Sequence, residues 1–297
     1  MKLLITGGSG LYGSKLAQLA TNKQHQVFSA HNQHPTTYGH PIKLDITNKA
    51  QVETALKKAQ PDVVVHAASL TDVDKCELNP KLAMKINIKG TDNIVQALKK
   101  INAFLIFIST DYVFNGEKGY YTETDQPSPI NYYGYTKLKA EEHVKTINSK
   151  YCIARTSVIY GATPAAGKTN FALWLLDKLN KKERARVFTD QWNSPTLNTS
   201  LAEMTLEIAE RNLAGIYHLS GVTRISRFEF AILLSKTFKL DTNLIIPTLS
   251  TELSFPAKRP QDSSLNTSKA QQTLGNQPLQ IDEALKKLKE EFRFARS

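Results

Sequence analysis

Two side chains that stand four residues apart, Tyr133 and Lys137, are the first candidates for chemistry in this sequence. They belong to the segment YYGYTK, and because positions i and i+4 share one face of a helix, only Tyr133 among its tyrosines faces the lysine. An ammonium beside a phenol favours the phenolate and moves the tyrosine pKa toward the working pH. Such a phenol can donate a proton to a carbonyl oxygen while a hydride reaches the carbonyl carbon. The spacing alone arises often by chance, so its meaning depends on the surrounding elements.

A glycine-rich loop near the N-terminus has the spacing of a dinucleotide-binding turn. In TGGSGLYG, Gly7 would allow the tight turn, Gly10 the approach of a pyrophosphate to the backbone, and Gly13 close packing of the helix on the sheet. The helix N-terminus would add free N–H groups and its positive dipole end. The predicted cofactor contacts of this loop are Gly7, Gly10, Leu11, Tyr12 and Gly13.

The end of the expected second strand bears on the choice of cofactor. Residues 29–33 read SAHNQ, with no acidic residue to bind the ribose 2′-hydroxyl of NAD. The missing acid leaves room for a 2′-phosphate, so the sequence favours NADP(H), with NAD(H) as the alternative. No arginine stands there to bind that phosphate, and Lys43 is only a distant candidate.

Two further pieces fit the same predicted pocket. Asp45, followed by Ile46, places an acid where the adenine amino group could be bound. Ala67 and Ala68 end another strand with small residues, across which the cofactor could lie. His66, which precedes them, is interpreted as a packed residue at the end of a strand rather than a catalytic one.

A hydroxyl residue stands at the tip of the strand that precedes the Tyr133 helix. That strand ends in ISTDYVF, residues 108–114. A hydroxyl at this tip can hydrogen-bond the same carbonyl oxygen as the tyrosine and share its developing charge. A serine or threonine that ends a strand is ordinarily structural. Its place at the carboxyl edge of the sheet, where open α/β folds bind ligands, favours a functional role here.

The elements that must position these residues alternate between strands and helices. Alternation of this kind predicts βαβ units and a Rossmann-type, doubly wound parallel sheet covered by helices on both faces. The expected strands are 2–6, 26–30, 62–66, 104–109 and 151–155, and the expected helices are 11–21, 49–59, 81–100 and 132–149.

After residue 161 the pattern becomes less regular and predicts a smaller α/β lobe. Helices are expected at 170–180, 201–211, 227–238 and 282–292, with short extended pieces at 215–219 and 244–246. We therefore expect an NAD(P)-binding domain at 1–160 and a substrate-binding lobe at 161–297, some of whose elements could return to the main sheet. A substrate cleft is expected where the two meet.

The composition, 41% hydrophobic and 22% charged, is that of an ordinary globular protein. The chain runs from Met1 directly into an apolar strand, and no apolar run is long enough to cross a bilayer, so we expect a cytoplasmic protein without a membrane partner. Its two cysteines, Cys76 and Cys152, form no CxxC motif, and no histidine pair has metal-site spacing. Neither a disulfide framework nor a metal site is expected.

The net charge of +11 raises the question of an anionic partner. The basic residues are spread along the chain, and only KKERAR at 181–186 is dense. A solvated helix end explains this cluster best, ahead of contact with an anionic small molecule and, last, with nucleic acid. No nucleic-acid partner is expected, although a basic field also concentrates diphosphate substrates.

Taken together, these motifs resemble the extended short-chain dehydrogenases and, within them, the dTDP-4-dehydrorhamnose reductases. STDYVF followed by YGxTK is specific to this branch, and DQxxxPT and RPxxSxLxxSK lie in the second lobe. The matching segments are TGGSGLYG (6–13), HAASLTDVDKCE (66–77), STDYVFNG (109–116), INYYGYTKLKAE (130–141), RTSVIYG (155–161), TDQWNSPT (189–196), GIYHLSG (215–221), ISRFEFA (225–231) and KRPQDSSLNTSK (258–269).

The resemblance implies a reaction and a set of roles. The reaction is hydride transfer from NAD(P)H to the C4 ketone of dTDP-4-dehydro-L-rhamnose, which gives dTDP-L-rhamnose. Tyr133 would be the acid, and Lys137 would bind the nicotinamide ribose and depress the tyrosine pKa. The roles implied for the other residues are catalysis for Thr110, support of the lysine through water for Asn87, contact with the sugar for Val73, Asp111 and Tyr112, and contact with the nucleotide end for Asn170 and Trp192.

Other readings of the same skeleton stay open. No residue pattern independently identifies the base or the sugar, so both come from the resemblance. The skeleton also resembles the regulatory subunit of methionine adenosyltransferase, which binds NADP and serves as a partner protein, and more distantly the nucleotide-sugar epimerases and dehydratases. A homodimer is common in the family, but the sequence leaves the oligomeric state open.

Overall fold

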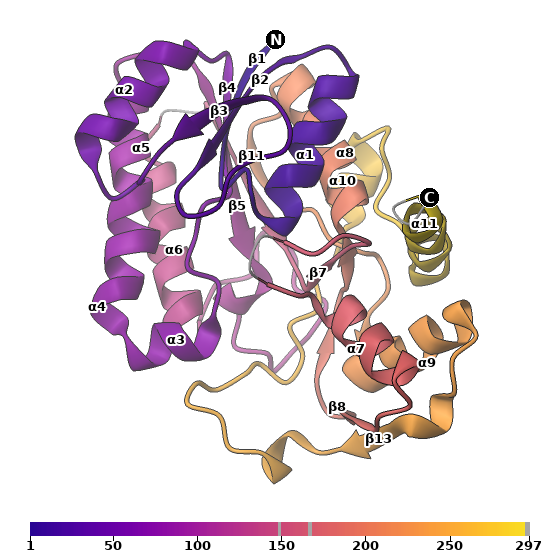
Figure 1. The fold of residues 1–297 in the computed structure, drawn as a ribbon. Coiled ribbons are helices and arrows are strands. Elements are labelled where there is room, and N and C mark those ends of the chain that lie inside the picture. The colour runs from indigo at the N-terminus through magenta and orange to yellow at the C-terminus, as the bar shows by residue number, and fades with distance from the viewer. Residues whose placement is uncertain (148–149, 166–167, 295–297) are drawn as a thin grey trace.

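The fold is built on a parallel sheet of seven strands in the order β11-β6-β5-β4-β1-β2-β3 (Figure 1). It is seen in a computed structural model that describes residues 1–147, 150–165 and 168–294. The strands are β1 (Lys2–Thr6), β2 (Gln26–His31), β3 (His40–Lys43), β4 (Val63–His66), β5 (Phe104–Thr110), β6 (Tyr151–Thr156) and β11 (Gly215–His218). Every neighbouring pair is parallel, which confirms the predicted fold class.

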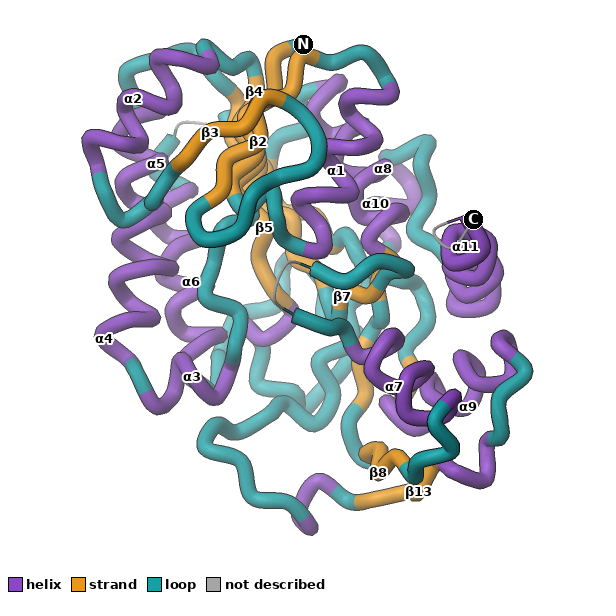
Figure 2. The backbone as a smooth tube through the Cα atoms, viewed as in Figure 1, coloured by secondary structure: helices purple, strands orange, loops and turns teal. Residues whose placement is uncertain are grey.

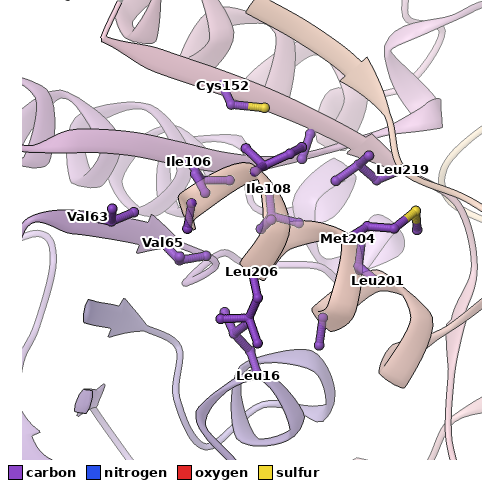
Figure 3. Packing of buried hydrophobic residues seen from close by; sticks show 14 of the residues in the cluster. Leu16, Val63, Val65, Ile106, Ile108, Cys152, Leu201, Met204, Leu206 and Leu219 are labelled. Carbon is purple, nitrogen blue, oxygen red and sulfur yellow. The ribbon is translucent and has the colours of Figure 1, made fainter. Parts of the chain in front are cut away.

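Helices cover both faces of this sheet, so the central strands are apolar along their whole length. Successive strand residues point to opposite faces, which is why Leu3 and Leu4 belong to different hydrophobic clusters. One face packs against α1 (Leu11–Asn22) and α8 (Asn198–Arg211), as Figure 3 shows for side chains of this cluster. The other face packs against α2 (Lys49–Ala59), α5 (Gly90–Leu98) and α6 (Tyr132–Val144).

The remaining elements form a region with its own core and more loop than the rest (Figure 2). Its strands form the pairs β10–β7, β12–β9 and β13–β8. They are β7 (Ile159–Tyr160), β8 (Ala185–Phe188), β9 (Trp192–Asn193), β10 (Thr196–Leu197), β12 (Ile225–Ser226) and β13 (Ile245–Thr248). Its helices are α7 (Phe171–Asn180), α9 (Arg227–Phe238) and α11 (Ile281–Phe294), with short turns η3 (Thr242–Leu244) and η4 (Ser250–Glu252). α10 (Ser268–Thr273) packs instead into the core of the main sheet.

Two elements from beyond residue 160 complete the layers of the first half. β11 pairs with β6 at the edge of the main sheet, and α8 packs beside α1 in the same core. The two halves therefore share a hydrophobic core. The division at residue 160 stays a prediction about function rather than an observed boundary.

The helix expected at 81–100 is interrupted. The chain forms α3 (Val73–Leu78) and α4 (Pro80–Ala83), then a π-helical segment, η1 (Met84–Lys89), before α5 begins at Gly90. At Gly90 an added Cβ would lie 2.7 Å from Ile46 Cδ1, so glycine lets this helix press against the loop after β3. π-helical turns inside helices often accompany functional sites.

Other predicted elements also differ from the structure. The helix expected to reach residue 149 ends at Val144, and residues 148–149 lie outside the described part of the chain. β3 was not expected at all. The basic cluster 181–186 is not simply a helix end, because it runs into β8, and within it Lys181 and Arg186 pair with Asp177 and Glu252. No helix in the described residues is long and apolar enough to span a membrane.

Candidate active site

A cavity of about 950 Å³ opens at the carboxyl ends of the central strands and reaches into the second half of the chain. It lies where the strand order reverses, between β1 and β4, the position at which open α/β sheets bind ligands. Asn87 and Trp192 are described but do not line it. The predicted site residues that do are Gly7, Gly10, Leu11, Tyr12, Gly13, Asp45, Ile46, Ala67, Ala68, Val73, Thr110, Asp111, Tyr112, Tyr133, Lys137 and Asn170.

The glycine loop between β1 and α1 has the geometry that a pyrophosphate needs. Gly7 has φ of +72°, a left-handed backbone that glycine adopts without strain. A Cβ at Gly13 would lie 2.2 Å from the Gly7 carbonyl oxygen, so the helix residue must also be glycine. Gly10 is the N-cap of α1 and provides no side-chain capping bond. The first N–H groups and the positive helix end therefore suit a dinucleotide cofactor.

The adenosine end of the predicted cofactor site lies beside β2 and β3. The two strands pair with His31 next to Lys43, and Lys43 Nζ donates to the carbonyl oxygen of Asn32. Lys43 thus adjoins the strand end where a ribose 2′-substituent would be read, although the cavity itself is lined by the neighbouring His31 and Leu44 and not by Lys43. The short β3, which contains Pro41, gave no clear strand pattern, and only the pairing shows this proximity.

Tyr133 is brought to the strand tip by the way α6 begins. The side chain of Asn131 caps the helix, accepting from the Gly134 N–H at 2.8 Å. A Cβ at Gly134 would lie 2.0 Å from the Tyr112 carbonyl oxygen, so glycine allows α6 to approach the turn η2 (Asp111–Val113). As a result, the rings of Tyr112 and Tyr133 meet edge to face at 6.1 Å, and the Tyr133 side chain hydrogen-bonds with that of Thr110.

The electrostatics of the tyrosine–lysine pair differ from the prediction. Burial raises the pKa of Tyr133, and its hydrogen bond to Thr110 opposes this only in part, so the expected depression of the tyrosine pKa was wrong for this structure. Burial lowers the pKa of Lys137 to about 7, against the opposing charge of Glu141. The Lys137 ammonium donates to the Ile108 carbonyl oxygen at 2.7 Å and lies 4.0 Å from the centre of the Phe107 ring.

A buried ion pair that the sequence analysis did not predict supports this face of α6. Glu141, four residues beyond Lys137, accepts from Arg155 at 3.0 and 2.7 Å and from the Ser109 hydroxyl at 2.6 Å. Both side chains of the pair are almost fully buried. The i+4 spacing from Lys137 could have indicated Glu141, but no sequence spacing indicates that Arg155 on β6 is its partner.

Asn87 has a different set of partners from the one predicted. Its amide oxygen accepts from Leu70 N–H and from the Ser69 hydroxyl, at 2.8 and 2.9 Å. Its amide nitrogen donates to the Leu70 carbonyl oxygen and to the Thr136 hydroxyl, at 3.1 and 3.0 Å. The side chain thus ties the loop after β4 to α6. Asn87 therefore contacts the helix that carries Lys137. Its predicted support of the lysine through water stays a prediction.

The predicted nucleotide contacts divide into two cases. Asn170 lines the cavity, but its amide caps α7 by accepting from Leu173 N–H and donating to the Gly161 carbonyl oxygen. Trp192 does not line the cavity, and its indole lies 5.1 Å from the Arg224 guanidinium instead. His66 is buried between Thr6 and Thr91, at 2.7 and 3.1 Å, as expected for a packed residue.

Among the cations that line the cavity and that the sequence analysis did not single out, two come from the second half of the chain. They are Lys168 and Arg227, the first residue of α9. Arg227 is held by Gln191, whose side-chain oxygen accepts from Nε at 3.1 Å and whose carbonyl oxygen accepts from the Arg227 N–H at 3.0 Å. Its side chain also hydrogen-bonds with Tyr112. Only the fold brings α9 to the tip of β5.

A doubly wound parallel sheet, a glycine loop after β1 and a tyrosine–lysine pair at the start of α6 define an extended short-chain dehydrogenase/reductase. The chain belongs to the RmlD substrate binding domain family, whose model matches residues 1–294.

Relatives over nearly the whole length support the same class. The chain is 33% identical to dTDP-4-dehydrorhamnose reductase of Aggregatibacter actinomycetemcomitans, over 97% of this chain and 98% of the relative. It is 31% identical to the probable low-salt glycan biosynthesis reductase Agl14 of Haloferax volcanii, over 95% and 96%. It is also 29% identical to methionine adenosyltransferase 2 subunit beta of Rattus norvegicus, over 92% and 82%.

A solved structure agrees in fold. Dehydrorhamnose reductase of Bacillus anthracis, determined in complex with NADP, matches with a TM-score of 0.88 at 31% identity, covering 98% of this chain and 100% of that one. The family is thus one of NAD(P)-dependent nucleotide-sugar reductases, and its relatives include a subunit of methionine adenosyltransferase.

Proposed function

We propose that this protein reduces the C4 ketone of dTDP-4-dehydro-L-rhamnose with NADPH and forms dTDP-L-rhamnose. The observation that carries this proposal is that Tyr133, Thr110 and Lys137 meet in the same cavity as the phosphate loop. A bound reduced nicotinamide would supply the hydride to the carbonyl carbon.

The side chains of the chain itself account for the proton. Because burial raises the pKa of Tyr133, the phenol is protonated at neutral pH and can donate to the ketone oxygen as it gains charge. Lys137 would bind the nicotinamide ribose, and its ammonium would stabilise the phenolate that remains after proton transfer. Lys137 needs its proton for both tasks, and its pKa of about 7 lies near the pH at which the protein would work.

The cavity lining offers groups for both parts of a nucleotide sugar. Val73 and Tyr112 line the cavity and would contact the sugar, while Arg227 and Lys168 would bind the diphosphate. A guanidinium can bind phosphate oxygens in a bidentate manner, and Gln191 already fixes the direction of Arg227.

We assign the preference for NADPH to the edge formed by β2 and β3. Lys43, beside His31, would pair with the 2′-phosphate of the adenosine ribose. Lys43→Met should lower kcat/KM for NADPH about tenfold, because a hydrogen bond to a charged group is lost, and should leave NADH unaffected. Lys58→Met, which removes an exposed lysine from α2, is the matched control. An unchanged ratio between the two cofactors in Lys43→Met would contradict the assignment.

The direct test of the reaction mixes purified protein with dTDP-4-dehydro-L-rhamnose and either NADPH or NADH, and follows the nicotinamide absorbance. We expect oxidation of NADPH with formation of dTDP-L-rhamnose. Binding of NADPH without turnover, together with co-purification of a synthetase, would instead support a regulatory subunit like the methionine adenosyltransferase relative. Tightly retained NAD in the purified protein would support an epimerase.

A further inference from the structure

The carboxylate of Asp111 is the meeting point of three hydroxyl groups from separate parts of the chain. Its Oδ1 accepts from Thr110 Oγ1 at 3.0 Å, and its Oδ2 accepts from Ser157 and Ser263 at 2.8 and 2.6 Å. Asp111 is 3% exposed, and Ser157 and Ser263 are equally buried. A buried carboxylate is stable only when its oxygens are paired in this way, so the donors hold it in place.

This arrangement fixes which way the Thr110 hydroxyl points. Its single hydrogen goes to Asp111, and one of its lone pairs accepts from the Tyr112 N–H at 3.2 Å. The Thr110 hydroxyl also hydrogen-bonds with the Tyr133 phenol, and this bond lowers the pKa of Tyr133. The Asp111 carboxylate therefore sets the direction of a hydroxyl that acts on the Tyr133 phenol.

One donor to Asp111 belongs to a sequence motif for which the reaction itself gives no role. Ser263 is the serine of RPxxSxLxxSK, and Arg259 of the same motif anchors the segment by pairing with Asp74 through two contacts of 2.6 Å. The neighbouring Ser264 is buried as deeply, but its hydroxyl donates to Asp262 at 2.7 Å. Of these two adjacent serines, Ser263 donates to Asp111 and Ser264 to Asp262.

We propose that Asp111 is a positioning residue which, held by Ser157 and Ser263, fixes the direction of the Thr110 hydroxyl at the strand tip and with it the alignment of Thr110 with the Tyr133 phenol. The proposal rests on the proposed reductase function. It gives Asp111 a role in positioning the acid, in place of the sugar contact that the resemblance implied. It also links the C-terminal segment that contains Ser263 to the strand tip at Thr110.

The first test compares turnover in Asp111→Asn, Ser263→Ala and the control Ser264→Ala. Asp111→Asn should lower kcat about 10²-fold while the Kd for NADPH changes less than about twofold, since misalignment affects the chemical step and not the cofactor loop. Ser263→Ala should lower kcat about tenfold through the loss of one charged hydrogen bond. Ser264→Ala should keep wild-type turnover.

A pH profile separates positioning from a merely structural role. The Asp111 charge raises the pKa of Tyr133, so Asp111→Asn should move the alkaline limb of kcat to lower pH. Arg227 of α9, Tyr112 of η2 and Tyr133 of α6 are the other charged or titratable groups that interact with Asp111, and all three remain in this variant. An alkaline limb that does not move, or equal losses in Ser263→Ala and Ser264→Ala, would overturn the proposal.

A measurement without substrate tests the contact between Ser263 and Asp111 independently of the reaction. Carbon-13 NMR of labelled aspartate carboxyls, with Asp111→Asn for assignment, reports the Asp111 titration directly. Because Ser263 lowers the pKa of Asp111, Ser263→Ala should raise it and Ser264→Ala should not. If the wild type reduces no 4-keto sugar, the proposed function fails, and this titration still decides whether Ser263 holds Asp111.

Discussion

The two halves of this chain hold their functional groups in different ways. In the first half, Thr110 and Tyr133 stand at a strand end and in the first turn of a helix, on a sheet of seven paired strands. In the second half, the strands are two to four residues long, and side chains hold the loops. Gln191, for example, accepts from the Nε and the backbone N–H of Arg227 at 3.1 and 3.0 Å. Backbone pairing thus fixes the proton-transfer groups, whereas long-range polar contacts fix the substrate end.

The largest expected effect lies at the acid on the rigid sheet edge. Tyr133→Phe should reduce kcat by about 10³-fold, because it removes the hydroxyl that is proposed to donate the proton to the ketone. Cofactor binding, measured by NADPH fluorescence, should stay close to that of the wild type. Tyr135→Phe, two residues further along the same helix and exposed, is the control and should retain full turnover. Undiminished kcat in Tyr133→Phe would move the chemistry elsewhere.

The ion pairs of the two halves offer a second contrast. Glu141→Gln leaves the Arg155 guanidinium buried without its carboxylate, which should lower the free energy of unfolding by about 3 kcal/mol or more. Glu252→Gln breaks the pair with Arg186, whose side chains are 50% and 48% exposed, and should cost less than about 1 kcal/mol. Urea denaturation measures both. Equal losses would erase the distinction between the halves.

Two glycines sharpen the comparison further. Gly13→Ala places a methyl group 2.2 Å from the Gly7 carbonyl oxygen, so we expect a loss of about 1–3 kcal/mol in stability and weaker NADPH binding. Gly275→Ala, in the second half, meets no atom closer than 3.6 Å and should leave both quantities unchanged. Denaturation measures the stability of each variant, and cofactor titration measures its NADPH binding. Unchanged values in Gly13→Ala would mean that the phosphate loop can move aside.

The last contrast concerns pH. Burial lowers the pKa of Lys137 from an ordinary 10.5 to about 7, so between these values the unfolded chain binds a proton that the folded protein lacks. The free energy of unfolding of the wild type should therefore rise with pH across this window, relative to that of Lys137→Met. Parallel denaturation series of the two proteins test this. A difference that is constant with pH would show that Lys137 keeps its proton.

The first half could be predicted closely because its signals are local. Apolar runs, glycine spacing and the i+4 rule gave the sheet, the phosphate loop and Tyr133 with Lys137. The misses have specific causes. β3 is short and contains Pro41, so it showed no pattern until it paired with β2. The π-helical turn at 84–89 contains Asn87, whose contacts with Leu70 and Thr136 no helical periodicity records.

By itself, the sequence determined the α/β class, the glycine loop and the choice of Tyr133 as the proposed acid, because each depends on residues within a few positions of one another. The tertiary structure alone decided that Lys43 adjoins the end of β2, that Arg227 reaches the cavity and that Trp192 does not. It also decided that Ser263 donates to the Asp111 carboxylate, 152 residues away in the chain. Such contacts arise from how distant elements pack, and no local spacing encodes them.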